Sequence, residues 1–240
     1  MNLLFLVEGD QTEPRVYRSW LKYLFPELIF VNRPEDMTQN TCRIIAGGGY
    51  PNMVSKPKNN SEPSRLEACL MDIEKFGNID HFFICVDSEQ YTYQERFDEV
   101  KSKLDNFQAN YKIDPSKTQI HLIVQNCCIE TWALGNAEIP NQYPRLKKSV
   151  DWKNFQTHFD ISVNDPETLS DFPPEYSFRN KANLHGRYLQ EYLAEFGLKY
   201  LKKRPTVIAE KKYLEALQKR CQNTEHLPSL KMLFNIWESL

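Results

Sequence analysis

The chain has 240 residues, of which 41% are hydrophobic and 26% charged, and its formal net charge is −2. This length and composition are typical of a globular protein with a sizeable core, and the small net charge selects no class of partner. The sequence has no run of about 18 or more apolar residues and no basic leader, which argues against a membrane span and a signal peptide. Six cysteines without a C-x-x-C pair predict reduced core thiols in a cytoplasmic protein.

The first predicted element is a strand over residues 3–7, five apolar residues in succession that end at Glu8 and Gly9. A helix from Thr12 to Phe25 follows, with Pro14 in its first turn, where proline is tolerated. An unbroken apolar run is typical of a parallel strand buried on both faces. Glu8 therefore falls at the carboxyl edge of the predicted sheet, where open α/β sheets place their chemistry.

Strands and helices alternate along the rest of the first half. A capping box of Ser64 and Glu67 marks the start of one helix, and Thr92 with Glu95 marks another. The alternation predicts an α/β fold with a parallel sheet flanked by helices. The predicted strands are 28–31, 42–46, 81–89 and 119–125, and the predicted helices are 64–76 and 92–107, with a turn and a helix over 126–134.

The pattern changes after residue 135. Residues 136–180 are rich in proline and predict loops with a single helix over 151–159, and residues 183–203 predict a long helix that ends before Pro205. Two further helices are expected over 207–221 and 230–237. We therefore expect an α/β domain over residues 1–135 and a helical lobe over 136–240 that packs on the sheet.

Carboxylates close two of the strongest predicted strands. Glu8 ends the first and Asp87 ends the strand that begins at His81. The carboxyl ends of parallel strands meet at one edge, and adjacent strands lie about 4.8 Å apart, so both side chains can reach one ion. Clustered acids repel one another unless a cation compensates, and Mg²⁺ prefers oxygen ligands. No cluster of histidines or cysteines is visible in the sequence, which argues against zinc.

Three further acids have an ordinary alternative beside the metal hypothesis. Glu13 is equally explained as an acid that favours the positive N-terminus of its helix. Glu89 is also explained as a surface residue before a helix cap. Glu130 is also explained as a residue of the first turn of its own helix.

Three stretches together resemble the Toprim superfamily, and within it the RloB-like and related small Toprim-like proteins of prokaryotic defence loci. The overcoming-lysogenization-defect nucleases share the domain. The resemblance covers about residues 1–135. It rests on Val7-Glu8-Gly9-x-x-x-Glu13, on Val86-Asp87-Ser88-Glu89 and on Ile129-Glu130-Thr131-Trp132.

The resemblance implies a role for each acid. Glu8 matches a glutamate that binds metal or acts as the general base, and Glu13 matches the second acid of the nuclease branch. Asp87 and Glu89 stand where the family has Asp-x-Asp, with the longer glutamate in second place. Glu130 matches the acid of a Glu-x-Trp element.

The expected activity is metal-assisted hydrolysis of phosphodiester bonds. Mg²⁺ or Mn²⁺ held by these carboxylates would orient the scissile phosphate and lower the pKa of an attacking water. Lys181, in the predicted loop before the long helix, is the candidate cation for the transition-state charge, and basic clusters would contact the nucleic acid backbone. The ordinary alternative is a solvated loop charge for Lys181 and a solvated helix face for each cluster. Those clusters are Arg145 with Lys147 and Lys148, Lys202 with Lys203 and Arg204, and Lys211 with Lys212.

The sequence itself contains no P-loop motif for ATP binding, and the resemblance implies a partner. The glycines at 47–49 are not followed by Gly-Lys-Ser/Thr, so they form no P-loop. The resemblance implies a separate ATPase partner and a phage-defence effector, while DNA, RNA or tRNA as substrate and the oligomeric state are left open. The alternative function is a non-catalytic Toprim-like binding or sensor module in a complex with the ATPase.

Overall fold

The computed structural model describes residues 1–56, 62–147 and 149–240. These residues group into two compact units, each described here by itself. The first unit comprises residues 1–87 and 93–124, and the second comprises 88–92 and 125–240. Residues 125–135, which the sequence placed with the sheet, group with the second unit, and the domain boundary expected at residue 135 stays a prediction.

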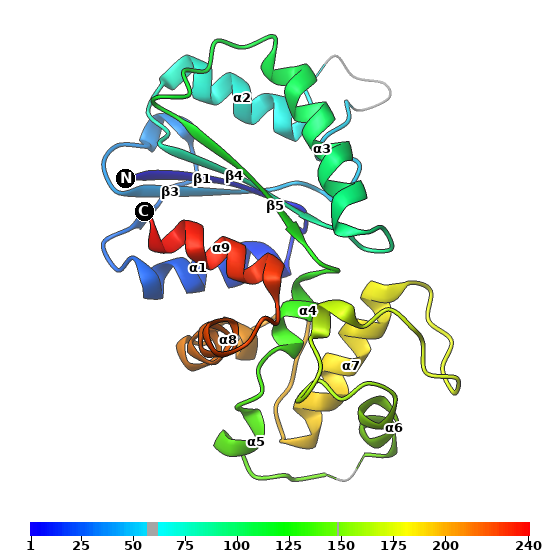
Figure 1. Cartoon of the computed structure of the whole chain (residues 1–240). Coiled ribbons are helices and arrows are strands. Elements are labelled where there is room, and N and C mark those ends of the chain that lie inside the picture. The colour runs from blue at the N-terminus through cyan, green and yellow to red at the C-terminus, as the bar shows by residue number, and fades with distance from the viewer. Residues whose placement is uncertain (57–61, 148) are drawn as a thin grey trace. The chain divides into compact units, whose positions relative to one another are not determined.

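One five-stranded sheet organises the first unit (Figure 1). Its strand order is β2-β3-β1-β4-β5, and β1 pairs in parallel with both β3 and β4. The fold class expected from the sequence, an α/β fold with a parallel sheet and a C-terminal helical region, is confirmed. The strands are β1 (Asn2–Val7), β2 (Ile29–Phe30), β3 (Thr41–Ala46), β4 (His81–Asp87) and β5 (Gln119–Gln125).

Helices cover both faces of this sheet. Helix α1 (Thr12–Leu24) lies on one face, and α2 (Arg65–Phe76) and α3 (Tyr93–Gln108) lie on the other (Figure 1). A short 3₁₀ turn, η1 (Pro34–Asp36), follows β2. The alternation along β1 explains the two layers, because successive side chains of a strand point to opposite faces. Leu4 and Leu6 belong to the core formed with α2 and α3, whereas the Phe5 ring lies 5.6 Å from the Tyr17 ring of α1.

The start of α2 follows from the sequence. The Ser64 hydroxyl accepts the N–H of Glu67 at 3.2 Å, and the Glu67 carboxylate accepts the N–H of Ser64 at 3.4 Å. This is the predicted capping box, which satisfies two backbone donors that a helix leaves without intrahelical partners. Gly77 ends the helix in the left-handed conformation, with φ of 59°.

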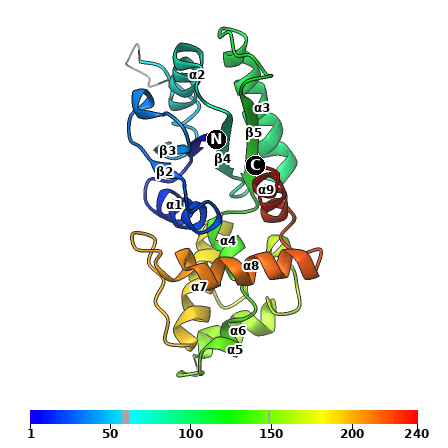
Figure 2. The same ribbon diagram turned by 90° about the vertical axis from the view of Figure 1, so that its left-hand side faces the viewer.

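The second unit consists of helices and connecting segments. Helix α6 packs against α7 (Figure 2), where Trp152 and Phe155 stack on Tyr192 and Tyr188, both with ring centroids 5.0 Å apart. The elements of this unit are α4 (Ile129–Leu134), α5 (Ile139–Gln142), α6 (Val150–His158), η2 (Pro166–Thr168), α7 (Lys181–Glu195), η3 (Val207–Ala209), α8 (Lys211–Asn223) and α9 (Pro228–Glu238).

Two helix boundaries predicted in the second half are wrong. The predicted helix over 183–203 ends at Glu195, because Gly197 takes up the left-handed conformation with φ of 72°. The N–H of Leu198 then donates to the carbonyl of Leu193 at 2.9 Å, and the N–H of Gly197 donates to Ala194 at 3.1 Å, which is a Schellman motif. The helix predicted over 207–221 divides into η3 and α8, because Glu210 has an extended backbone with ψ of 148°.

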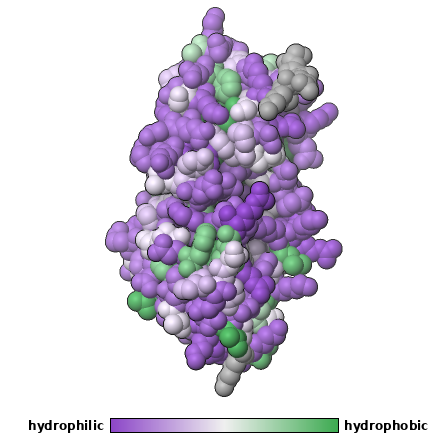
Figure 3. Space-filling view, turned by 90° about the vertical axis from the view of Figure 1, so that its right-hand side faces the viewer, coloured by the Kyte–Doolittle hydropathy of each residue, from purple (hydrophilic) through white to green (hydrophobic). Residues whose placement is uncertain are grey.

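The surface matches the ordinary composition of the chain. On the face drawn in Figure 3, hydrophilic residues predominate and hydrophobic residues form small, separate patches. Across the three described ranges, every helix is too short or too polar to cross a bilayer.

Candidate functional site

Glu8 and Asp87 lie at neighbouring strand ends, as the sequence predicted. Glu8 follows β1 directly, Asp87 is the last residue of β4, and the two strands are adjacent and parallel. The backbone N–H of Asp87 donates to Oε2 of Glu8 at 3.0 Å. Glu8 is only 7% exposed, so its carboxylate is held in a largely dry position at the carboxyl edge of the sheet.

The glycine-rich loop after β3 donates further hydrogen bonds to Glu8. The N–H of Tyr50 donates to Oε1 of Glu8 at 3.2 Å, and the N–H of Gly49 donates to the Glu8 carbonyl at 2.9 Å. The Tyr50 ring lies under the guanidinium of Arg96, 3.9 Å from ring centroid to Cζ, and Arg96 donates to Glu99 at 2.9 Å. The sequence excluded a P-loop here but did not predict that the loop would hold the carboxylate of Glu8.

Glu13 joins these two acids. It belongs to the first turn of α1, is 6% exposed, and its carboxylate lies against Gly9. A Cβ placed on Gly9 would come within 2.2 Å of Oε2 of Glu13, so only glycine allows this approach. Burial raises the pKa of the Cys85 thiol to about 12, and the charges of Glu13 and Asp87 add to that rise. In the first unit, Glu8 and Asp87 therefore meet at adjacent strand ends, Glu13 lies against Gly9, and the charges of Glu13 and Asp87 both act on Cys85.

The other two predicted acids belong to the second unit. Glu89 has φ of 51°, and its N–H donates to the carbonyl of Cys127 at 3.0 Å. A non-glycine residue in the left-handed region costs roughly 1 kcal/mol or more, and such strain is concentrated at functional positions. Glu130 is in the first turn of α4 and is 2% exposed. Its Oε1 accepts the hydroxyl of Tyr200 at 2.7 Å and the ammonium of Lys202 at 3.1 Å.

Two of the predicted cations, Lys181 and Lys202, have surroundings that differ from expectation. Lys181 was expected in a loop before a helix, but it is the first residue of α7, where the Asn180 side chain accepts the N–H of Asn183 at 2.9 Å. Lys202 was expected to contact a nucleic acid backbone, and in the structure it pairs with Glu130. An ion pair at Glu130 competes with metal coordination, because it already compensates the charge of the carboxylate.

Several of the other predicted backbone-contacting cations are also paired. Arg145 pairs with the buried Glu195, and Lys211 with Glu215 at 3.7 Å. Lys212 lies 3.8 Å from Glu210. Lys148 lies outside the described residues. The expected contacts of these basic clusters with nucleic acid stay a prediction.

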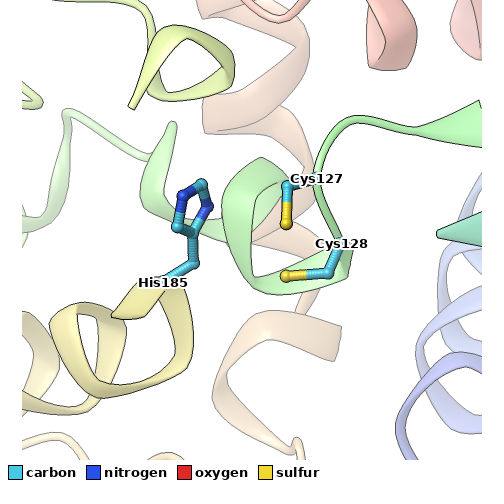
Figure 4. A group of neighbouring side chains, drawn as sticks. All are labelled: Cys127, Cys128 and His185. Atoms are coloured by element: carbon cyan, nitrogen blue, oxygen red, sulfur yellow. The ribbon is translucent and has the colours of Figure 1, made fainter. Parts of the chain in front are cut away.

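A cluster of two cysteines and a histidine was not predicted. Cys127 and Cys128 precede α4, and His185 comes from α7 (Figure 4). All three side chains are buried, and their ligand atoms lie within 4.8 Å of one another. The sequence had argued against any such group, because His185 is far from the cysteines along the chain and only the packing of α7 against α4 brings it to them.

Hydrogen bonds define the protonation state of His185. Its Nε2 lies 3.0 Å from the carbonyl of Leu169, which can only accept, so Nε2 carries the proton. Nδ1 is then an acceptor and lies 2.6 Å from the hydroxyl of Thr131. Burial lowers the pKa of His185 to about 4. The same Thr131 oxygen accepts the N–H groups of Cys127 at 3.1 Å and Cys128 at 3.2 Å.

The chemistry of the two groups differs. Carboxylate oxygens at the edge of the sheet suit a hard divalent cation such as Mg²⁺, whereas sulfur and imidazole nitrogen suit a softer metal. Comparison of the chain with models of protein families, with curated proteins and with solved structures finds no match.

Proposed function

We propose that the chain is a Mg²⁺- or Mn²⁺-dependent nuclease that hydrolyses phosphodiester bonds on a Toprim-like sheet. The observation that supports it most is the juxtaposition of Glu8 and Asp87. The two residues come from neighbouring parallel strands, and the backbone N–H of Asp87 donates to the Glu8 carboxylate at 3.0 Å, at the edge of the sheet where α/β enzymes bind their ligands. Glu13 adds a third buried carboxylate beside Gly9.

The residues present fit a hard divalent cation. Each oxygen of Glu8 receives one backbone N–H, from Tyr50 or from Asp87, which fixes the orientation of the carboxylate. Carboxylate oxygens are the ligands that a hard divalent cation prefers. When bound, Mg²⁺ would supply charge stabilisation at the phosphate and a lowered pKa of an attacking water.

The proposed roles follow the sequence motif. Glu8, Glu13 and Asp87, all of the first unit, hold the cation and orient the water. Glu89 and Glu130 as further ligands, and Lys181 as the cation that stabilises the charge of the transition state, are proposed from the sequence alone, because all three belong to the second unit. The ion pair of Glu130 with Lys202 makes Glu130 the weakest of the predicted ligands.

The biological setting is proposed from the resemblance of the motif. We propose that the substrate is DNA or RNA, including tRNA. We also propose that the chain acts with an ATPase encoded as a separate protein and is the effector of a phage-defence system. Attack on nucleic acid by an effector of this kind would require control, which the ATPase partner would provide.

The decisive experiment assays purified protein with Mg²⁺ or Mn²⁺ on DNA, RNA and free nucleotides in parallel. Glu8→Gln and Asp87→Asn keep the shape of each side chain and remove its charge, so we expect both to abolish cleavage. Glu27→Gln alters an exposed acid of the first unit and should cleave as the wild type does. Cleavage by Glu8→Gln and Asp87→Asn at the wild-type rate would contradict the proposal.

Cation binding gives a second readout that does not depend on the substrate. A ligand that binds only the folded state raises the melting temperature. We therefore expect Mn²⁺ to raise the melting temperature of the wild type and of Glu27→Gln, but not that of Glu8→Gln. An equal rise in all three proteins would place the cation elsewhere.

The neutralised Glu130 favours one second candidate, a Toprim-like binding or sensor module that keeps its acids without cleaving. Its carboxylate is already satisfied by Tyr200 and Lys202, which suits a structural role. Two results together would favour this alternative. Mn²⁺ would raise the melting temperature of the wild type, and the protein would cleave no substrate either by itself or with an ATPase partner.

A further inference from the structure

We propose that Cys127, Cys128 and His185 form a zinc site in the second unit, separate from the carboxylates of Glu8 and Asp87 in the first. The site lies between the turn before α4 and the first half of α7 (Figure 4). Two thiolates and one imidazole are a common donor set for zinc, with a fourth position for an oxygen ligand such as water.

The distances between the donor atoms support the assignment. The two sulfur atoms and the imidazole nitrogen all lie within 4.8 Å of one another. Around one tetrahedral zinc, with bonds of about 2.3 Å to sulfur and about 2.0 Å to nitrogen, such atoms lie roughly 3.5–3.8 Å apart. Closing the site therefore requires movements on the order of 1 Å, within reach of side-chain rotation.

The hydrogen bond at the far side of His185 is the one that zinc-binding histidines make. Nε2–H donates to the carbonyl of Leu169 at 3.0 Å, which fixes the tautomer and directs the lone pair of Nδ1 toward the cysteines. Metal-binding histidines almost always donate their second N–H to a carbonyl, a carboxylate or water. The orientation of the ligand is therefore prepared before any metal arrives.

Without metal, the hydroxyl of Thr131 supplies the hydrogen bond that Nδ1 of His185 needs, and this hydroxyl can change partner when metal binds. Its hydroxyl donates to Nδ1 of His185 at 2.6 Å, and its oxygen lies 3.6 Å from Sγ of Cys128. When zinc takes the lone pair of Nδ1, the hydroxyl can turn its hydrogen to that sulfur and keep both of its backbone donors.

Charge balance suits the buried location. Binding of Zn²⁺ would release the two thiol protons to solvent, and two thiolates with one Zn²⁺ leave no net charge. A neutral site avoids the cost of a charge buried away from water. Because all three side chains are buried, we expect the metal to be incorporated as the chain folds.

The test is to produce the full chain in medium supplemented with Co²⁺, purify it under reducing conditions and record its absorption spectrum. Cobalt bound by thiolates gives a charge-transfer band in the near ultraviolet, and tetrahedral cobalt gives intense visible bands. We expect about one equivalent of cobalt with both features in the wild type. Parallel growth with zinc should yield about one equivalent of zinc by mass spectrometry of the metal.

Variants assign the bands to their ligands. Cys127→Ser and Cys128→Ser should each lose about half of the charge-transfer intensity, whereas Cys221→Ser, at another buried cysteine of the same unit, should keep it. Glu8→Gln should also keep it, which separates this site from the proposed nuclease centre. Because the wild-type intensity by itself reports two thiolates, the test does not depend on the variants folding.

Three results would overturn the proposal. The first is wild-type protein without bound cobalt or zinc, and the second is cobalt bound without a charge-transfer band. The third is a band that persists undiminished in the double variant Cys127→Ser and Cys128→Ser.

Discussion

Glu167 is a buried acid whose protonation is set by its surroundings in the second unit. Its Oε1 accepts the hydroxyl of Ser229 at 2.6 Å, and that hydroxyl oxygen also accepts the indole N–H of Trp132 at 2.8 Å. Burial raises the pKa of Glu167 from 4.5 to about 7, the charge of Asp165 adds to the rise, and the bonds from Ser229 oppose it. The folded chain therefore holds this proton at pH values where an unfolded chain has lost it.

This shift predicts a pH dependence of stability. A carboxyl whose pKa is raised on folding stabilises the folded state below its unfolded pKa, and this contribution is lost as pH rises from about 4.5 to about 7. Over that window, the free energy of unfolding of the wild type should fall by about 3 kcal/mol relative to Glu167→Gln. Urea denaturation of both proteins between pH 4.5 and 7.5 measures the difference.

The comparison with Glu167→Gln is needed because other groups titrate in the same range with the opposite sign. Burial lowers the pKa of both His121 and His185 to about 4, so their contribution to stability grows as pH rises toward their unfolded pKa. Those terms cancel between the two proteins. Replacement of the exposed Glu238 by Gln should leave the wild-type profile unchanged, and parallel profiles for wild type and Glu167→Gln would contradict the prediction.

At the scale of elements, helix α7 ends beside one glycine that its structure requires and contains another that it does not require. Gly197 lies just beyond its end with φ of 72° and allows the bond from Leu198 to Leu193. Gly186 is in the middle of the helix, and a Cβ added there would have only Cε of Lys202 within 4 Å, at 4.0 Å. The same residue type therefore has opposite effects at the two positions.

Alanine at each position should change stability with opposite signs. Gly186→Ala removes backbone freedom from the unfolded chain and should stabilise by roughly 0.5–1 kcal/mol. Gly197→Ala should destabilise by about 1 kcal/mol, because a Cβ is strained in the left-handed region. That Cβ would also lie 2.5 Å from Cδ1 of Leu146, an exposed side chain that can move aside. Thermal denaturation of both variants measures the two changes.

Gly77 provides a matched control for the second substitution. It ends α2 with φ of 59°, and a Cβ there would meet nothing within 4 Å. Gly77→Ala should therefore cost about the same as Gly197→Ala, since backbone strain dominates in both. A stabilising Gly197→Ala would show that the end of α7 is assigned wrongly, and a destabilising Gly186→Ala would contradict the open space beside Gly186.

At the scale of the whole molecule, stability should be distributed unevenly over the described residues. The central strands β1 and β4 have fully buried side chains from Leu3 to Val7 and from Phe82 to Val86. The edge strand β2 has only two residues, with Ile29 61% exposed. Opening β1 or β4 would disrupt the core on both faces of the sheet, whereas β2 can open locally.

Hydrogen exchange followed by mass spectrometry should reveal this difference. Amides of 3–7 and 82–86 should exchange slowest, close to the rate of global unfolding, because a local opening cannot expose them. Amides of 29–30 should exchange faster by several orders of magnitude. Comparable rates for β1 and β2 would contradict the central position of β1 in the sheet.

The sequence by itself determined the elements whose signals are local. The apolar run before Glu8 defined β1, and the pair of Ser64 and Glu67 defined the start of α2, since both depend on neighbours within a few residues. The position of Glu8 beside Asp87 also followed, because the ends of parallel strands meet at one edge of a sheet.

Only the tertiary structure decided which side chains distant in sequence satisfy one another. No local pattern in the sequence indicates these contacts. They are the ion pair of Glu130 with Lys202, the proximity of His185 to Cys127, and the hydrogen bond from the Tyr50 N–H to the Glu8 carboxylate. Burial also determined protonation: Glu167 and His185 have altered pKa values because packing removes them from water. Local propensity is encoded by near neighbours, whereas desolvation and ion pairing depend on contacts that form only when the chain has folded.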